Sequence, residues 1–106
     1  MMVNKTKSVI ISDVKIKGNV IEKEDIVIDG KVEGNINAEF VETFENSVIK
    51  GNIKSKETVI GGKVKGDINS DRVHIKKTAD VDGTIKQKTL SIEEGSLLTI
   101  KTEIKK

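Results

Sequence analysis

A short pattern of alternating apolar and polar residues around a glycine recurs along the whole chain. It is clearest in KVEGNI (31–36), VIKGNI (48–53), KVKGDI (63–68) and DVDGTI (80–85). The glycines of the series are Gly18, Gly34, Gly51, Gly66 and Gly83, which are 16, 17, 15 and 17 residues apart. Self-similarity at a fixed period is the signature of a repeat architecture. We therefore expect each repeat to form one structural unit.

The residues around each glycine predict a half-buried strand. Two positions before and two positions after the glycine stand β-branched aliphatic residues, and the positions between are polar, as Lys65 and Asp67 are around Gly66. Alternate residues of a strand face the same side, so the aliphatic residues and the glycine share the inward face. A glycine there indicates that a side chain would crowd the interior or that the backbone bends. The inward aliphatic residues are Ile16, Val20, Val32, Ile36, Ile49, Ile53, Val64, Ile68, Val81 and Ile85.

Each repeat also carries a second pair of inward positions. The pairs are Ile26/Ile28, Val41/Thr43, Thr58/Ile60, Val73/Ile75 and Leu90/Ile92. They alternate with residues expected to face outward, such as Val27, Glu42 and His74. Four residues after each glycine stand Glu22, Ala38, Ser55, Ser70 and Gln87, which we interpret as a third, weaker face or a corner. The links to the next repeat come in two lengths, and the longer ones carry a small residue, Ser47 or Ala79, expected to turn inward.

Stacked coils explain why the same residue type returns at the same phase of every repeat. No window shows the 3.6-residue periodicity of a helix, and a sandwich of hairpins would not keep one phase throughout. The sequence therefore predicts an all-β fold, a parallel β-helix with three strand positions per coil and about six coils. A chain of 106 residues makes one domain. We place it at residues 9–104, with tails at 1–8 and 105–106.

The last repeat departs from the pattern. The segment LSIEEGSLLTIKTEI (90–104) aligns without gaps on VHIKKTADVDGTIKQ (73–87), but Ile100 replaces the glycine and Leu97 falls on the outward Asp80. Solenoid ends normally carry polar caps, because an uncapped end exposes unpaired backbone groups and open core. Charged tails could blunt both ends, but we favour association through them. The candidate polymerisation interface is Val9, Ile10 and Ile11 at one end and Leu97, Leu98, Ile100 and Ile104 at the other.

Composition and charge narrow the range of partners. The 19 basic and 17 acidic residues are interspersed, the net charge is +2 and only 2% of residues are aromatic. Nucleic-acid sites need a basic footprint and, for single strands, stacking aromatic side chains, so we expect no nucleic-acid partner. Without Cys there is no disulfide and no thiolate metal site. No apolar stretch has the length of a signal peptide or a membrane span, which predicts a soluble intracellular protein.

No group of residues predicts catalysis. The single histidine, His74, alternates with Val73 and Ile75, so an ordinary solvated side chain is favoured over a catalytic base or a zinc ligand. The acidic runs EKED (22–25) and EE (93–94) lack the spacing of an oxygen-ligand loop, and no phosphate-binding glycine motif occurs. The aliphatic hexapeptide period of the acyltransferase β-helices is also missing. We expect no enzyme activity, no cofactor and no metal.

The repeated KVEGNI, KVKGDI and VDGTI segments, the run VIDGKVEG (27–34) and the closing SIEEGSLL (91–98) resemble the bactofilins, small bacterial cytoskeletal proteins. The resemblance implies a right-handed, three-sided parallel β-helix that polymerises end to end into filaments without nucleotide. It also implies a structural scaffold for cell shape, whose partners are further copies of itself, cell-wall enzymes and membrane proteins. The implied localisation is cytoplasmic, in the cytoskeleton, at the cytoplasmic face of the inner membrane.

Three departures from the bactofilin pattern bear on these expectations. The chain has almost none of the Pro-rich tail sequence that many relatives carry, and Leu98 stands where a bulky aromatic residue is common. The membrane-targeting stretch is reduced to Met1, Met2 and Val3, so only a weak membrane-surface association is expected. The alternative function is a monomeric or trimeric β-helix binding module, and a hexapeptide-like acyltransferase is less favoured. Asn19, Asn35 and Asn52 are interpreted as amide ladders that stabilise the coils.

Overall fold

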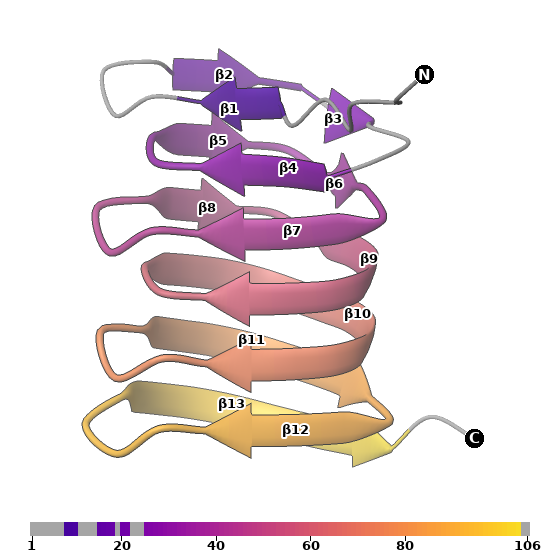
Figure 1. Cartoon of the computed structure of the whole chain (residues 1–106), viewed down its shortest axis with the longest axis vertical. Coiled ribbons are helices and arrows are strands. Elements are labelled where there is room, and N and C mark those ends of the chain that lie inside the picture. The colour runs from indigo at the N-terminus through magenta and orange to yellow at the C-terminus, as the bar shows by residue number, and fades with distance from the viewer. Residues whose placement is uncertain (1–7, 11–14, 19, 22–24, 105–106) are drawn as a thin grey trace, which may run out of the picture.

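The chain folds into a stack of coils wound around one axis. The computed structural model describes residues 8–10, 15–18, 20–21 and 25–104. The first and last described strands lie at opposite ends of the stack, and the chain winds clockwise as it recedes from the first strand, so the solenoid is right-handed (Figure 1). The strands are β1 (Ser8–Ile10), β2 (Lys15–Lys17), β3 (Val20–Ile21), β4 (Asp25–Ile28), β5 (Lys31–Glu33), β6 (Ile36–Asn37), β7 (Phe40–Thr43), β8 (Val48–Lys50), β9 (Ile53–Ile60), β10 (Lys63–Ile75), β11 (Asp80–Gln87), β12 (Thr89–Ile92) and β13 (Leu97–Ile104).

Each coil pairs in parallel with the next at every strand position, as the repeat predicts. Register partners on one side run through Lys17, Glu33, Lys50, Lys65, Asp82 and Thr99. These are five full circuits, one fewer than the predicted count, because that count took the partial first and last coils as whole ones. Three strand positions per coil are seen most clearly in β4, β5 and β6. In the later coils, β9 and β10 bend around corners without interruption.

The length of one connecting turn changes the period of the solenoid. Turns 29–30 and 61–62 have two residues, whereas 44–47, 76–79 and 93–96 have four. From Ile49 to Val64 the chain passes a two-residue turn and the register advances by 15, whereas from Val64 to Val81 it passes a four-residue turn and advances by 17. The extra residues fold inward as predicted, because Ser47 and Ala79 are buried.

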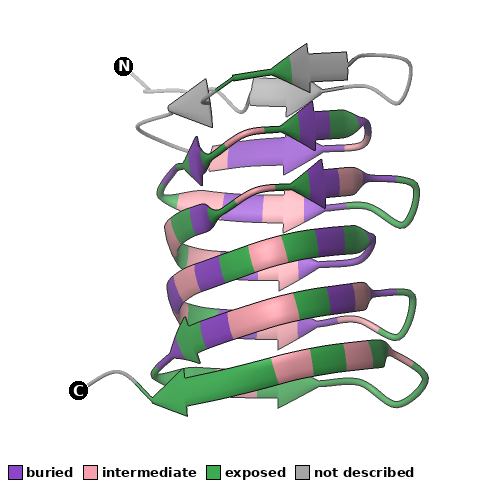
Figure 2. Cartoon of the chain, turned by 180° about the vertical axis from the view of Figure 1, so that it is seen from behind, coloured by how far each residue is buried: buried purple, intermediate pink, exposed green. Residues whose placement is uncertain are grey.

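The interior is a column of stacked aliphatic side chains. Within the described side chains, the predicted inward residues from Ile26 to Ile85 are buried, and most are at most 2% exposed. Figure 2 shows the result as alternating buried and exposed bands along the inner coils. The fully buried large side chains are Ile26, Ile28, Ile36, Ile49, Ile53, Ile60, Ile68, Ile75, Ile85, Val32, Val41 and Val64. This column removes the chain's main apolar surface from water and is the principal source of stability.

The position four residues after the corner glycines, predicted to be a third face or a corner, turns inward: Ala38, Ser70 and Gln87 are buried and Ser55 is half-buried. A small or polar side chain there is tolerated because the hydroxyls bond within the core: Ser70 Oγ lies 3.2 Å from Ser55 Oγ and donates to the carbonyl of Arg72. Val27, expected outside, is only 7% exposed. Outward side chains of adjacent coils are about 4.8 Å apart, so they shield one another.

The repeated glycines form one corner of the solenoid and are required there. Gly51 and Gly83 have φ angles of +142° and +145°, a region that side chains rarely adopt. A Cβ atom on either would overlap the carbonyl oxygen of the glycine one coil earlier, Gly34 or Gly66. Both explanations predicted for the glycine are therefore correct: the backbone bends there, and a side chain would not fit.

Among the described residues no helix is long and apolar enough to cross a bilayer.

Candidate functional site: the open C-terminal end

The last coil offers unpaired strand edges. β12 pairs with β10 and β13 pairs with β11, and no other described strand pairs with either of them. Backbone groups of both strands therefore point away from the stack without a strand to receive them. Such an edge is a template for pairing with another chain. The predicted uncapped end is present at this side of the solenoid (Figure 1).

The side chains of this coil remain exposed where their copies are buried. Ile75 is fully buried, but its register partner Ile92 is 48% exposed. Leu98, the partner of the buried Val81, is half-buried and packs against the core together with Ile100 and Leu90. Leu97 and Ile104 are 66% and 77% exposed. The core thus continues to the end of the rod and stops there uncovered (Figure 2).

The corner glycine is missing from β13, which changes the shape of its edge. Ile100 is the register partner of Gly83, yet no described residue other than glycine has a positive φ. The strand therefore runs through the corner position without the bend of the earlier coils. Its eight residues, Leu97–Ile104, form one continuous edge.

Hydrogen bonds fasten the last coil to the one before it. Glu93 bridges the two coils: its Oε2 lies 2.9 Å from Nε2 of His74, and its Oε1 accepts the backbone N–H of Lys77 at 3.2 Å. The hydrogen bond from His74, followed by that from Lys77, lowers the pKa of the Glu93 carboxyl below its ordinary value of 4.5. Lys86 and Glu103 form a further ion pair at 3.7 Å between β11 and β13. The open end is thus held in a defined geometry.

The candidate interface residues divide between described and undescribed parts of the chain. Leu97, Leu98, Ile100 and Ile104 lie together on the last coil, as expected. Val9 and Ile10 lie in β1, which pairs with β4, but their side chains are not described, and Ile11 lies outside the described residues. Leu90 and Ile92 belong to the same open surface and were assigned only to the interior pattern. Their exposure could have been predicted from the sequence, because they lie in the final repeat and no later repeat follows to cover them.

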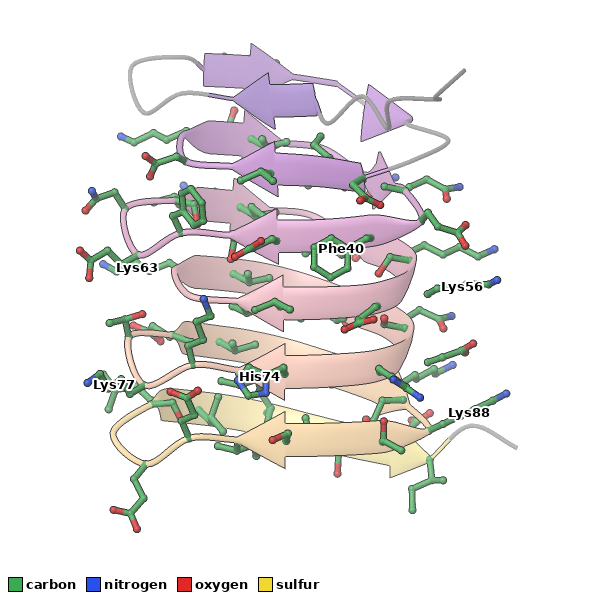
Figure 3. The ribbon with its side chains drawn as sticks, in the orientation of Figure 1. Phe40, Lys56, Lys63, His74, Lys77 and Lys88 are labelled. Atoms are coloured by element: carbon green, nitrogen blue, oxygen red, sulfur yellow. The ribbon has the colours of Figure 1, made fainter. Side chains whose placement is uncertain are left out.

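The remaining polar residues singled out in the sequence have structural roles. Asn35 Oδ1 accepts the backbone N–H of Asn52, and Asn52 Oδ1 accepts that of Asp67, each at 3.2 Å. These amides join consecutive coils beside the corner glycines, and Asn19 lies outside the described residues. His74 points outward toward Glu93 (Figure 3). Within the described part of the chain, no three His, Cys, Asp or Glu side chains are grouped as metal ligands.

Comparison with known proteins agrees with this architecture. The family profile named bactofilin, described as polymer-forming cytoskeletal, matches residues 8–103. The chain belongs to the bactofilin family. It is therefore a member of a family of polymer-forming cytoskeletal proteins. Among curated protein sequences, none matches the chain significantly.

Two solved bactofilin structures have the same fold. The cytoskeletal bactofilin BacA, determined by solid-state NMR, is 26% identical, with a TM-score of 0.87 over 96% of this chain and 99% of that one. A bactofilin from Thermus thermophilus, reconstructed by cryo-electron microscopy as double helical filaments, is 22% identical, with a TM-score of 0.84 over 92% of this chain and 99% of that one. Both cover nearly the whole length of the present bactofilin.

Proposed function

We propose that this bactofilin polymerises end to end, without nucleotide, through the open coils at its two ends. The observation that carries the proposal is the last coil, where Ile92, Leu97 and Ile104 are exposed beside two strands whose outer edges are unpaired. A second molecule stacked on this end would bury the apolar residues and pair the backbone in one step. Val9, Ile10 and Ile11 are the proposed contact at the other end.

The energy for growth comes from the contact itself. Fully burying a Leu or Ile side chain contributes about 1.5–3 kcal/mol. Given the 48%, 66% and 77% exposure of Ile92, Leu97 and Ile104, their burial contributes about 3–6 kcal/mol. Association costs a comparable amount in lost freedom of motion, so strand pairing along β12 and β13 has to supply the surplus. Neither contribution requires nucleotide hydrolysis.

The filament serves as a scaffold that positions cell-envelope or cell-shape factors. We place it in the cytoplasm, with cell-wall enzymes or membrane proteins as clients and with weak association at the inner membrane. The support for this part of the proposal is membership of a polymer-forming cytoskeletal family. In a filament every subunit presents the same side faces at regular intervals, which suits a scaffold. No enzymatic step is part of the proposal.

Negative-stain electron microscopy of the purified protein without nucleotide tests the end contact. We expect filaments from the parent and short, folded particles from Leu98→Arg, because the arginine places an unpaired charge in the apolar contact. Glu33→Lys changes an exposed residue on a lateral face and should leave the filaments intact. Ile11→Lys tests the other end in the same way. Circular dichroism confirms that each variant keeps its β structure.

Other outcomes favour other functions. Filaments that persist in both Leu98→Arg and Ile11→Lys would place the contact elsewhere. A parent protein that stays monomeric, or closes into a trimer, would favour the β-helix binding module.

A further inference from the structure

The connecting turns of the inner coils form a groove at one edge of the rod. Turns 29–30, 44–47, 61–62 and 76–79 follow one another along the axis, and the four-residue turns project further than the two-residue ones (Figure 1). The groove has a volume of about 390 Å³, within the usual range of ligand sites. Each of the four turns contributes to its lining, through Asp29, Phe44, Glu45, Gly61, Lys76 and Thr78. We call it the turn groove.

Hydrogen bonds between the turns hold the groove in shape. Gly61 donates its backbone N–H to the carbonyl of Thr43 at 2.9 Å, and its own carbonyl accepts the hydroxyl of Thr78 at 2.7 Å. The short turn is thereby joined to the long turns on both sides. Within turn 44–47, Ser47 Oγ donates to the carbonyl of Phe44 at 2.7 Å. A site that is formed before its partner arrives loses little free energy to ordering on binding.

The charge of the turn groove is negative. Asp29 and Glu45 each contribute a carboxylate to the lining. Lys76 also lines the groove, but its Nζ lies 3.7 Å from Oε2 of Glu42, which offsets its charge. Oδ1 of Asp29 is buried, yet no group in the described part of the chain donates a hydrogen bond to it. A buried acceptor without a donor is costly, so a cation that carries N–H donors is the ligand that this groove favours.

The ring of Phe44 narrows the class of cation. It lines the groove and is 41% exposed, and the face of an aromatic ring attracts a cation placed over it. A guanidinium group is planar and carries five N–H donors, so it can stack on the ring while its edge donates to carboxylates. A metal ion fits less well, because the ring offers no ligand and the described residues hold no group of three His, Cys, Asp or Glu side chains.

We propose that the turn groove binds an arginine side chain of a partner polypeptide, with the guanidinium over Phe44 and its N–H groups donating to Asp29 and Glu45. The lining runs from Asp29 to Thr78 and includes no residue of the last coil, so a molecule stacked on that end leaves the groove accessible. One subunit carries the whole site, and the inference therefore does not depend on polymerisation. A filament would repeat the site once per subunit, which strengthens the binding of a partner that carries several arginines.

Saturation-transfer difference NMR with the peptide Gly-Gly-Arg-Gly-Gly-amide tests the binding, because this method detects weak ligands on single subunits and on filaments alike. We expect the signal to be strongest on the side-chain protons of the arginine. The same peptide with citrulline keeps the shape of the side chain without its charge and should bind about tenfold more weakly. A lysine peptide should also bind more weakly, since an ammonium group cannot stack or reach two carboxylates at once. Equal binding of the citrulline or the lysine peptide would overturn the proposal.

Variants of the protein assign the contacts. Asp29→Asn with Glu45→Gln removes both carboxylates and should weaken the binding of the arginine peptide about tenfold. Phe44→Leu keeps an apolar side chain without a ring and should weaken it about threefold. The control, Asp82→Asn with Glu94→Gln, removes the same charge at exposed positions outside the groove and should leave the affinity unchanged. Circular dichroism confirms that each variant is folded. Unchanged affinity after loss of both groove carboxylates would contradict the assignment.

Photo-cross-linking locates the peptide on the unaltered protein. With a benzophenone side chain next to its arginine, the peptide should cross-link to turn 44–47 or turn 76–79, as mapped by mass spectrometry. Cross-links confined to other parts of the chain would overturn the proposal.

A second copy of the protein is the competing occupant, because the chain has one arginine of its own, Arg72, which is exposed. If Arg72 of another molecule occupied the groove, Arg72→Gln would free the site and raise the affinity for the arginine peptide. We expect no change in this variant. A rise in affinity would replace the partner polypeptide by this chain itself.

Discussion

At the scale of single residues, the glycine corner and the Glu93 bridge each allow a specific test. The corner needs both a left-handed backbone and the space of an absent Cβ. The bridge needs a charged carboxylate that accepts hydrogen bonds from two places on the previous coil. We expect a large effect on stability at the corner, where a Cβ would overlap backbone atoms of the previous coil, and a smaller one at Glu93, whose side chain is exposed.

Gly51→Ala should destabilise the fold strongly. The added Cβ overlaps the carbonyl of Gly34, which is backbone and cannot move aside, and the positive φ adds about 1–2 kcal/mol of strain. We expect a loss of at least about 2 kcal/mol in the free energy of unfolding, measured by chemical denaturation. Gly95→Ala is the matched control, since it shares a positive φ but meets only the Lys77 side chain and backbone at 3.5 Å and 3.7 Å. Equal losses in both variants would show that strain alone, without the overlap, sets the requirement.

The Glu93 carboxyl should titrate below pH 4.5 in the folded protein. Its pKa is lowered chiefly by the His74 hydrogen bond, so His74→Ala should raise it toward the ordinary value. Because the folded pKa is the lower one, the bridge contributes stability above pH 4.5 and loses it as the pH falls through the folded pKa. NMR titration of the Glu93 side-chain carboxyl measures this pKa directly. A Glu93 midpoint unaffected by His74→Ala would rule out the His74 hydrogen bond as its cause.

At the scale of elements, β12 and β13 differ from the inner strands β4 to β11 in having one partner strand instead of two or more. The inner strands, such as β10, pair with coils on both sides. Interior coils are therefore fixed by symmetrical hydrogen bonding, whereas the last coil relies on one side and on the Glu93 bridge. Local opening free energies fall toward such edges.

Hydrogen exchange along β13 should report assembly. In the short particles of Leu98→Arg, the N–H groups of Leu97–Ile104 that point away from β11 should exchange quickly, and those bonded to β11 should exchange slowly. In parent filaments both sets should be slow, because the open edge is paired. Strand β11, which is covered on both sides, is the control and should not change. Fast exchange of the outward set in filaments would show that growth does not use this edge.

The same elements show how far sequence reasoning could reach. The spacing of Gly51 and Gly66 predicted the coil and its corner. A glycine between inward aliphatic residues indicates a bend in the strand or a position without space for a side chain. The interior position of Ser70 was not predicted, since a hydroxyl is indistinguishable from a surface residue until its partner Ser55 is placed one coil away. The contact of His74 with Glu93 joins residues 19 apart. It depends on the four-residue turn at 76–79, whose shape the pattern does not specify.

At the scale of the whole molecule, the sequence did not predict how the charged residues are arranged on the outer faces. Basic and acidic residues alternate along the chain and indicated no footprint, but coils of 15 and 17 residues sort them into columns. Lys63 and Asp80 became neighbours only through that register. The exposed ends were easier to predict than the side faces. An apolar final repeat departs from the polar caps that solenoid ends normally carry, whereas a charged residue at an outward position fits the repeat and gives no signal.

The combination of two- and four-residue turns has a consequence for how such a protein can change over generations. One short and one long coil together make 32 residues, as in the steps from Val32 to Ile49 and on to Val64. Duplication or deletion of such a block would lengthen or shorten the rod by about 10 Å and leave the first and last coils untouched. With growth through the two ends as proposed, subunit length can drift while descendants still copolymerise with their ancestors.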